Sequence, residues 1–386
     1  MKKVFPTMLL ASTALLMCAC GDSSSETPTI TDTNTSTTTT ELPPEPIYKT
    51  PHGSGALFAE EEGFMSNDAS VIEDENVRYV AYVSNENKDE NVNSIYVRKG
   101  EKDANGKYVY SERKLAIKSG AWDKRISAPS IVKGVFKLGD ETYKYLMAYQ
   151  GTSSDENFNY SIGFAYTNDV MGEWKKVGET ASVTYNPSVH GNNIYGMGSP
   201  ELINMGTSGE LMLFYTWGEA TLTCSEVRKV NASDLSSIKV DGQRQITVKG
   251  LQDGGENPIF ANAGFAFNKN KTMIYVARDV YPLSSIAPGH SNKIEVAKAS
   301  SNIFDNITLS WDSVKTVLGS DTIIEDDASS LGWDELYSGS FVKDAYGYLD
   351  DSKALELVYS GQDEKDSYEN DYRFSSFVCL MNIDLN

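Results

Sequence analysis

The segment Trp122–Asn168, WDKRISAPSIVKGVFKLGDETYKYLMAYQGTSSDENFNYSIGFAYTN, contains three short apolar runs in a fixed order. Ser130–Phe136 follows a proline, Lys144–Tyr149 ends just before Gly151, and Ser161–Tyr166 completes the set. Gly, Asp, Asn and Ser fill the connections, as is typical of turns between antiparallel strands. The segment therefore predicts three consecutive strands of a meander.

The same pattern recurs along the chain. Five strand openings are each followed by a second and a third apolar run, and the openings lie 60, 71, 63 and 76 residues apart. The openings are Asp68, Ala128, Ser199, Asn262 and Ser338. The second runs are Val77–Val83, Lys144–Tyr149, Leu211–Trp217, Thr272–Ala277 and Ala354–Tyr359. The third runs are Ser94–Arg98, Ser161–Tyr166, Ser225–Val230, Lys293–Ala297 and Ser375–Ile383.

Outer fourth strands are expected in segments such as Tyr108–Ile117 and Gln243–Val248. Repeated four-stranded antiparallel units with a long period are typical of a β-propeller. We therefore predict an all-β, five-bladed β-propeller. Two packed β-sandwiches are the alternative, but a sandwich does not require equal patterns at equal intervals.

Two Trp-Asp pairs stand just before strand openings: Trp122-Asp123 before the second and Trp333-Asp334 before the fifth. In a propeller, the loop before an opening strand and the loop between the second and third strands lie on one face. This predicts that both pairs share a face with the loops 150–160, 217–224, 278–292 and 361–373. Long polar loops of this kind often carry function.

The chain has 386 residues and a net charge of −20. This charge argues against nucleic acid as a partner, because phosphate binding needs a basic surface. Its simplest interpretation is solubility. The sequence shows no phosphate loop, nucleophile elbow or zinc motif, so we expect no cofactor. A calcium ion in the central channel would find oxygen ligands, but no motif specifies one.

The N-terminus predicts an exported, lipid-anchored protein. Lys2 and Lys3 precede an apolar run that ends at Ala19-Cys20, and this ending resembles a bacterial lipobox. We expect a signal peptide over residues 1–19, lipidation of Cys20, a Ser/Thr/Pro-rich disordered tether over 20–50, and a propeller over 51–386. An ordinary cleaved signal peptide is the alternative. Gly21, not Asp, follows Cys20, and by resemblance to Gram-negative lipoproteins this favours the outer membrane or cell surface.

Two further expectations concern the mature body of the chain. It retains Cys224 and Cys379, which fall in different blades. We predict two buried and unpaired thiols, although an exported domain could oxidise them. We also expect a monomer.

The pattern Ala128-Pro-Ser-Ile-Val, followed by Tyr145–Tyr149, Ile162–Tyr166 and Gly172-Glu-Trp174, resembles a blade of the five-bladed propeller superfamily of glycoside hydrolase families 43 and 32. The resemblance covers about Phe64 to Asn386. It implies carbohydrate as the partner and hydrolysis of a glycosidic bond. In those enzymes, three blade openings each carry a carboxylate: a base or nucleophile, a carboxylate that tunes a pKa, and a general acid.

The resemblance carries over to this chain only in part. Asp68 matches the position of the base or nucleophile, but Ala128 replaces the pKa-tuning Asp, and Gly198 stands where the acid is expected. Glu201 lies on the same side of its strand as Ser199 and is the candidate for a displaced acid. Asp68 could instead cap a turn, and Glu201 could be a hydrogen-bonded residue of the channel.

Further residues are candidates for binding a sugar. Tryptophan faces suit the apolar face of a sugar ring, although a tryptophan can equally fill the space between blades. The candidates are Trp122, Asp123, Trp217, Glu219, Asp279, Trp333 and Asp334. The sequence thus predicts a glycosidase-like surface lipoprotein acting on a poly- or oligosaccharide. The alternatives are a non-catalytic glycan-binding propeller and a scaffold in a surface assembly.

Overall fold

The computed structural model divides the chain into two compact units, Met1–Glu45 and Pro46–Asn386. The structure describes residues 48–49, 55–61, 63–88, 92–156, 158–184, 194–206, 208–219, 222–252, 259–280, 291–302, 309–322, 333, 335–362 and 376–385, all in the second unit. The predicted signal peptide, Cys20 and most of the predicted tether lie outside the described residues.

The described residues form five antiparallel meanders, one for each repeat of the sequence pattern, and the first and fifth are joined edge to edge into one eight-stranded sheet. Blade 1 is β3 (Asn67–Asp74), β4 (Val77–Asn85), β5 (Asn93–Lys102), β6 (Tyr108–Tyr110) and β7 (Lys114–Ile117). Blade 2 is β8 (Arg125–Leu138), β9 (Glu141–Thr152), β10 (Ser161–Thr167) and β11 (Lys175–Lys176). Blade 3 is β12 (Gly196–Asn204), β13 (Glu210–Glu219), β14 (Leu222–Asn231) and β15 (Lys239–Gln245).

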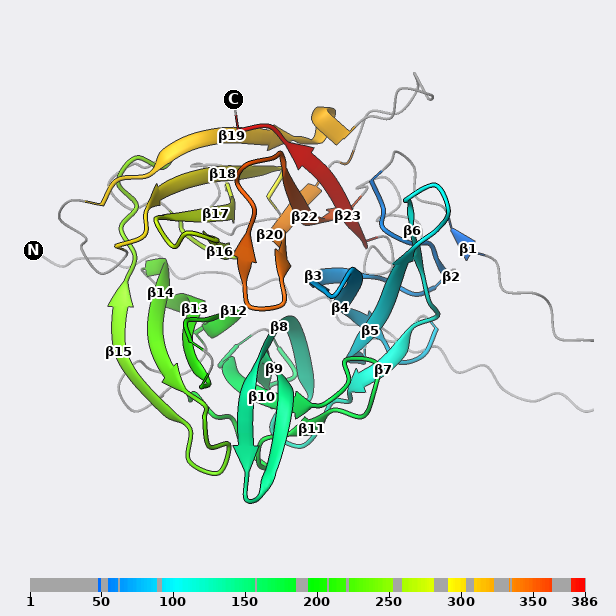
Figure 1. The fold of residues 1–386 in the computed structure, drawn as a ribbon, viewed down its shortest axis with the longest axis vertical. Coiled ribbons are helices and arrows are strands. Elements are labelled where there is room, and N and C mark those ends of the chain that lie inside the picture. The colour runs from blue at the N-terminus through cyan, green and yellow to red at the C-terminus, as the bar shows by residue number, and fades with distance from the viewer. Residues whose placement is uncertain are drawn as a thin grey trace, which may run out of the picture. The chain divides into compact units, whose positions relative to one another are not determined.

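Blade 4 is β16 (Gly264–Asn268), β17 (Met273–Asp279), β18 (Lys293–Ser300) and β19 (Asp312–Leu318), followed by the short 3₁₀ helix η1 (Gly319–Thr322). Blade 5 is β20 (Glu335–Asp344), β22 (Leu355–Gln362) and β23 (Ser376–Ile383). The short strand β21 (Tyr348–Leu349) pairs with β16 of blade 4. Figure 1 shows the sheets around a common centre, with β3, β8, β12, β16 and β20 innermost. The predicted five-bladed propeller is confirmed.

Neighbouring blades are joined along their innermost strands. β20 pairs in parallel with β3, and Ala263 and Gly339 form a parallel bridge between blades 4 and 5. Between blades 2 and 3, Tyr160, just before the third strand of blade 2, forms a parallel bridge with Gly196 at the start of β12. These parallel contacts arise because every opening strand runs in the same direction along the centre. All openings therefore lie at one end of the ring.

The core lies between the blades, because each sheet packs a face against its neighbours. The second strand of blade 3 is buried at every residue from Leu211 to Gly218, which fits a strand covered on both faces. Between blades 3 and 4, the rings of Phe214 and Phe265 stack at 4.4 Å between centroids. This burial explains why the second run of each repeat reads as a continuous apolar segment.

The five predicted openings share one unusual backbone conformation. Asp68, Ala128, Ser199, Asn262 and Ser338 all have a positive φ, between 46° and 52°. In blades 1, 2, 3 and 5 the ladder of the first two strands shifts register at this point, as in a β-bulge. Such residues cost on the order of 1–3 kcal/mol each and commonly occur where a strand redirects a side chain at a functional site. The predicted equivalence of the openings is confirmed.

Blade 5 is completed by residues near the start of the second unit. Ala56 pairs antiparallel with Cys379, and the Leu57 amide donates to the Val378 carbonyl at 2.9 Å. A few residues later, β2 (Glu60–Glu61) pairs with β1 (Tyr48–Lys49), and buried Glu60 accepts a hydrogen bond from Arg98 of blade 1 at 3.0 Å. Residues 55–61, which we call the closing segment, therefore contact blade 5 and blade 1 together.

Both cysteines of the mature body are buried and unpaired, as predicted. Cys224 lies in β14 and Cys379 in β23. The described part of the chain contains no helix with the length and apolarity that a membrane span requires.

Candidate functional site

A cavity of about 680 Å³ lies at the end of the ring where the opening strands begin. All five blades contribute to it, through residues at or just before the openings and at the ends of second and third strands. Its lining is Asn67, Asp68, Val83, Asn93, Arg125, Ile126, Ser127, Gln150, Phe158, Tyr160, Tyr195, Ser199, Asn262, Ser291, Tyr337 and Ser338. For blades 2 and 4, residues of the predicted loops 150–160 and 278–292 line the cavity together with the openings, as predicted. We call this space the mouth cavity.

Asp68 is the acidic residue of this lining. Its carboxylate accepts a hydrogen bond from the Ser338 hydroxyl at 2.5 Å, and its backbone N–H donates to the Ser360 hydroxyl at 3.0 Å. Burial raises the pKa of Tyr195 and of Tyr337, and the negative charge of Asp68 adds to the rise. These two phenols therefore stay protonated at neutral pH and can donate hydrogen bonds.

A hydrogen-bond network fixes the floor of the mouth cavity. Buried Gln150 accepts from the Ser199 amide at 2.6 Å and from the Tyr195 hydroxyl at 3.1 Å, and it donates to the Ser127 hydroxyl at 2.6 Å. The Ser199 hydroxyl donates to Asn262 at 3.0 Å. Because these groups hold one another in place, the polar wall is arranged before any ligand arrives.

Glu201 lies deeper, in β12, two residues beyond the opening Ser199. It borders a narrower hollow of about 40 Å³ that the opening residues of all five blades surround. One carboxylate oxygen accepts hydrogen bonds from the Ser130 hydroxyl, at 2.6 Å, and from the buried Lys343 ammonium. The other accepts from the Ser340 hydroxyl at 3.0 Å. Glu201 is therefore a hydrogen-bonded residue of the channel whose charge Lys343 balances.

Two of the predicted sugar-binding carboxylates are buried inside the fold. Asp123 is fully buried and accepts from Lys176 at 2.6 Å and from the Tyr149 hydroxyl at 3.0 Å. Asp279 is fully buried and accepts from the Asn262 side chain at 2.9 Å, so it positions a residue of the mouth cavity. Neither carboxylate lines the cavity.

The other predicted residues are placed as follows. Glu219 is half-buried at the end of β13 and does not line the mouth cavity. Asp334 lies outside the described residues, as do large parts of the predicted loops, at 220–221, 281–290 and 363–375.

The three candidate tryptophans lie within the blades. Trp217 and Trp333 are buried, and Trp122 is half-buried. A Cβ added to Gly151 would lie 3.0 Å from the Trp122 ring, and one added to Gly361 would lie 2.8 Å from the Trp333 ring. Each Trp-Asp pair therefore places an indole on a glycine of the second strand of its own blade. This packing explains the recurrence of the pair, and none of the three indoles lines the mouth cavity.

Sequence reasoning missed most of the mouth cavity's functional groups. Arg125, Gln150, Tyr160, Tyr195 and Tyr337 line it, yet none was a candidate. A positional signal exists: Arg125 and Tyr337 stand just before strand openings, and Gln150 stands near the end of a second strand. The repeat was read for carboxylates and tryptophans, so polar residues of other types at these positions were passed over.

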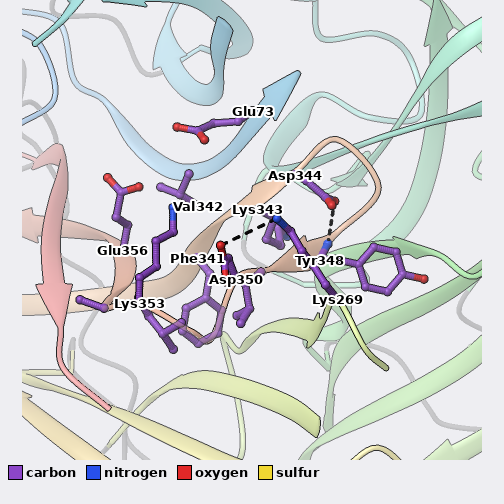
Figure 2. A pocket seen from close by; sticks show the side chains of 13 residues that line it. Glu73, Lys269, Phe341, Val342, Lys343, Asp344, Tyr348, Asp350, Lys353 and Glu356 are labelled. Carbon is purple, nitrogen blue, oxygen red and sulfur yellow. Dashed lines mark hydrogen bonds and ion pairs between the residues drawn. The ribbon is translucent and has the colours of Figure 1, made fainter. Parts of the chain in front are cut away.

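A second hollow, of about 80 Å³, lies at the opposite end of the inner strands, near the ends of β3 and β20. Figure 2 shows charged side chains of both signs around it. Arg78 binds Glu73 at 2.6 Å and Glu356 at 2.8 Å, and Lys269 lies 3.9 Å from Asp350. These pairs satisfy much of the local charge, and the hollow is too small for a sugar ring.

Within the described residues, no group of three or more His, Cys, Asp or Glu side chains is arranged to hold a metal ion. Instead, the Lys343 ammonium meets Glu201 at the centre of the ring.

No protein-family model matches the chain, and no curated protein matches it. Solved structures of glycoside hydrolases share its fold. The chain is 12% identical to Zg3597, a family 117 glycoside hydrolase from the marine bacterium Zobellia galactanivorans, with a TM-score of 0.55 over 88% of this chain and 90% of that one. It is 11% identical to a family 62 hydrolase solved with xylotriose, with a TM-score of 0.55 over 86% and 96%. It is also 11% identical to the catalytic domain of a family 62 α-L-arabinofuranosidase from Coprinopsis cinerea, with a TM-score of 0.53 over 86% and 96%. These similarities establish a fold shared with glycoside hydrolases of the five-bladed propeller type.

Proposed function

We propose that this protein binds a carbohydrate in the mouth cavity. The observation that carries the proposal is the lining itself. Phenol, amide and hydroxyl groups from all five blades surround about 680 Å³, and a network centred on Gln150 already orients several of them. A sugar presents several hydroxyl groups, each of which needs donors and acceptors when it leaves water. The fold shared with glycoside hydrolases adds support.

The geometry favours binding without cleavage over hydrolysis. Glycosidic hydrolysis uses two carboxyl groups, about 5 Å apart for retention or roughly 6.5–9.5 Å for inversion. Asp68 is the one carboxylate among the described residues that line the mouth cavity. The carboxylate of Glu201 is held by Lys343 and two serines. A glycan-binding propeller therefore fits these residues better than a glycosidase.

Hydrolysis is the second candidate, and the position of Asp68 favours it. Asp68 stands at the opening where the resemblance places the base or nucleophile, and it lines the cavity. The partner acid would then have to come from outside the described residues. The acid-rich segment 363–373 belongs to the loop 361–373 that the sequence predicts on this face.

One experiment separates the two functions. A panel of plant and microbial oligo- and polysaccharides is titrated against the wild type, Asp68→Asn and Asp140→Asn, with binding heat and reducing-end release measured together. Asp140 is the control because it is exposed in the turn between β8 and β9. We expect binding without reducing-end release. Asp68→Asn should weaken binding about tenfold or more, as for a lost charged hydrogen bond.

Each other outcome decides between the proposals. Reducing-end release by the wild type that Asp68→Asn abolishes would establish the hydrolase. A protein that binds no glycan in the panel would refute the carbohydrate proposal.

We also propose that the protein is exported and anchored to the cell envelope through Cys20. The supporting features are Lys2 and Lys3, the apolar run, and the Ala19-Cys20 ending. Several acyl chains together hold a protein firmly at a membrane, whereas one chain holds it weakly. Mass spectrometry of the mature N-terminus tests the proposal, which fails if the terminus is unmodified or if Cys18 carries the lipid.

A further inference from the structure

Arg125 brings a positive charge into the mouth cavity. It is the first residue of β8 and is half-buried. One guanidinium nitrogen donates to the backbone carbonyl of Asp155 at 2.6 Å. Among the described residues, no carboxylate lies within ion-pair distance of this guanidinium, although the chain has 54 acidic residues against 34 basic ones. Arg125 also interacts with the Tyr160 hydroxyl, and because arginine has five N–H donors, further donors remain for a ligand.

The fully buried cations among the described residues each have an acidic partner. They are Arg78 with Glu73 and Glu356, Arg98 with Glu60, Arg278 with Glu295, and Lys343 with Glu201. This arrangement follows from the cost of removing a charge from water without compensation. Arg125 is half-buried and, like the half-buried Arg113 and Arg228, forms no ion pair with a described carboxylate. It is the one cationic residue among the described residues that line the mouth cavity, where a bound ligand would remove water from the guanidinium.

Tyr160 shows that Arg125 and Asp68 act on the same part of the cavity. Burial, the largest effect, raises the pKa of Tyr160; the positive charge of Arg125 lowers it, and the negative charge of Asp68 raises it. Both charges thus reach one phenol. A ligand beside Tyr160 would meet a cation that suits a carboxylate and an anion that suits a hydroxyl group.

We infer that the ligand is an acidic glycan, with a uronic-acid residue whose carboxylate pairs with Arg125. The inference rests on the proposed carbohydrate binding. A guanidinium and a carboxylate are both planar and form two parallel hydrogen bonds, which gives strength and direction. The hydroxyl groups of the same sugar can donate to Asp68. A neutral sugar would leave the guanidinium without an anionic partner.

The test uses ligands that differ only in the carboxylate. The full-length chain in detergent is titrated with oligogalacturonates, oligoglucuronates and oligomannuronates, and with the carboxyl-reduced form of each. We expect at least one oligouronate to bind tenfold or more tightly than its reduced form. Arg125→Gln should weaken the oligouronate far more than its reduced form, so that the ratio of the two affinities falls to about one, and Arg125→Lys should keep part of the preference.

Lys124→Gln is the matched control, because it removes one positive charge from the neighbouring residue. Lys124 is exposed, lies 3.4 Å from the Asp155 carboxylate and does not line the mouth cavity. Its loss should leave the preference for uronates unchanged. Thermal unfolding of each variant shows whether it is folded.

The remaining outcomes separate this inference from the proposed function. Equal binding of an oligouronate and its reduced form refutes the inference and leaves carbohydrate binding in place. Tighter binding of sulfated than of uronate oligosaccharides also refutes it, in favour of a sulfate ligand. If Arg125→Gln weakens both forms equally, Arg125 supports the cavity wall and does not select the ligand. Absence of binding to every glycan refutes the proposed function itself.

Discussion

Glu201 and Lys343 form an ion pair in which both side chains are buried at the centre of the ring. Removing one partner leaves the other charge without compensation. We expect Glu201→Gln to lower the free energy of unfolding by about 3–5 kcal/mol, measured by urea denaturation. The double variant Glu201→Gln/Lys343→Met should recover a large part of this loss, because it removes both charges.

Glu179→Gln is the control for this prediction, since Glu179 is exposed and its loss should change stability by about 0.5 kcal/mol or less. Two results together would contradict this prediction. Glu201→Gln would be as stable as the wild type, and it would no longer hydrolyse a glycan that the wild type cleaves. Glu201 would then be the displaced acid, despite its ion pair with Lys343.

The two cysteine thiols should be inert in the folded protein. Burial raises the pKa of Cys224 and of Cys379 to about 12, and the charges of Glu226 and Glu219 add to the rise at Cys224. At pH 8 both thiols are therefore protonated and inaccessible, and the thiolate is the reactive form. In a chain that begins at residue 21, Ellman's reagent should react with no thiol in buffer and with both in urea. A fast reaction in buffer would contradict this burial.

The residues at the openings show how much of the candidate site can be predicted from the sequence. Asp68 and Glu201 could be placed relative to the strand openings because the repeat fixes the register of each inner strand. The pairing of Glu201 with Lys343 could not be predicted, since the two residues are 142 positions apart and belong to different blades. Arg125 could not be predicted for a related reason: what distinguishes it is its place on the wall of the mouth cavity, which depends on residues from all five blades.

At the scale of the strand, the left-handed backbone at each opening makes a direct prediction. Ala128 has φ of 48°, a conformation that costs an alanine about 1 kcal/mol and costs glycine almost nothing. We expect Ala128→Gly to leave the free energy of unfolding unchanged or to raise it by up to about 1 kcal/mol. Urea denaturation measures the change.

Ala148→Gly provides the comparison, because Ala148 is buried in the regular strand β9. At this position, glycine removes a packed methyl group from the folded protein and increases the backbone freedom of the unfolded chain. The variant should therefore be less stable by about 1 kcal/mol. If the two variants are destabilised equally, the opening conformation carries no strain.

Individual strands could be predicted because a blade covered on both faces needs nearly continuous apolar runs. Ser161–Tyr166 was predicted and Ser161–Thr167 is observed, while Val77–Val83 extends to Val77–Asn85. The outer strands were harder to bound. The predicted Tyr108–Ile117 is two short strands, Tyr108–Tyr110 and Lys114–Ile117, because an outer strand is packed on fewer sides and its pattern of burial is weaker.

At the scale of the whole propeller, the closing segment joins the two ends of the ring. Arg98 of blade 1 is buried, and its carboxylate partner is Glu60 of this segment. We expect a chain that begins at residue 46 to unfold with the same free energy as the full-length chain. A chain that begins at residue 62 should be less stable by about 3–5 kcal/mol, because Arg98 is left buried without its partner.

Urea denaturation of the two truncated chains tests the closing segment, and Glu60→Gln in the full-length chain is a milder version of the same change. Equal stability of both truncated chains would show that the segment does not hold the ring closed. This role is hard to predict from the sequence, because residues 55–61 contain one short apolar run and pair with the far end of the chain.

The shared backbone conformation of the openings has a consequence for how such a protein can evolve. The fold requires a left-handed turn at five equivalent positions, yet an aspartate, an alanine, an asparagine and two serines occupy them. The ancestral repeat therefore constrains the main chain and leaves the side chain free to vary. A lineage can exchange one opening residue at a time, gaining or losing a carboxylate, while the ring persists. The openings can thus acquire new ligands by single substitutions, which lets one scaffold diversify into cleaving and non-cleaving descendants.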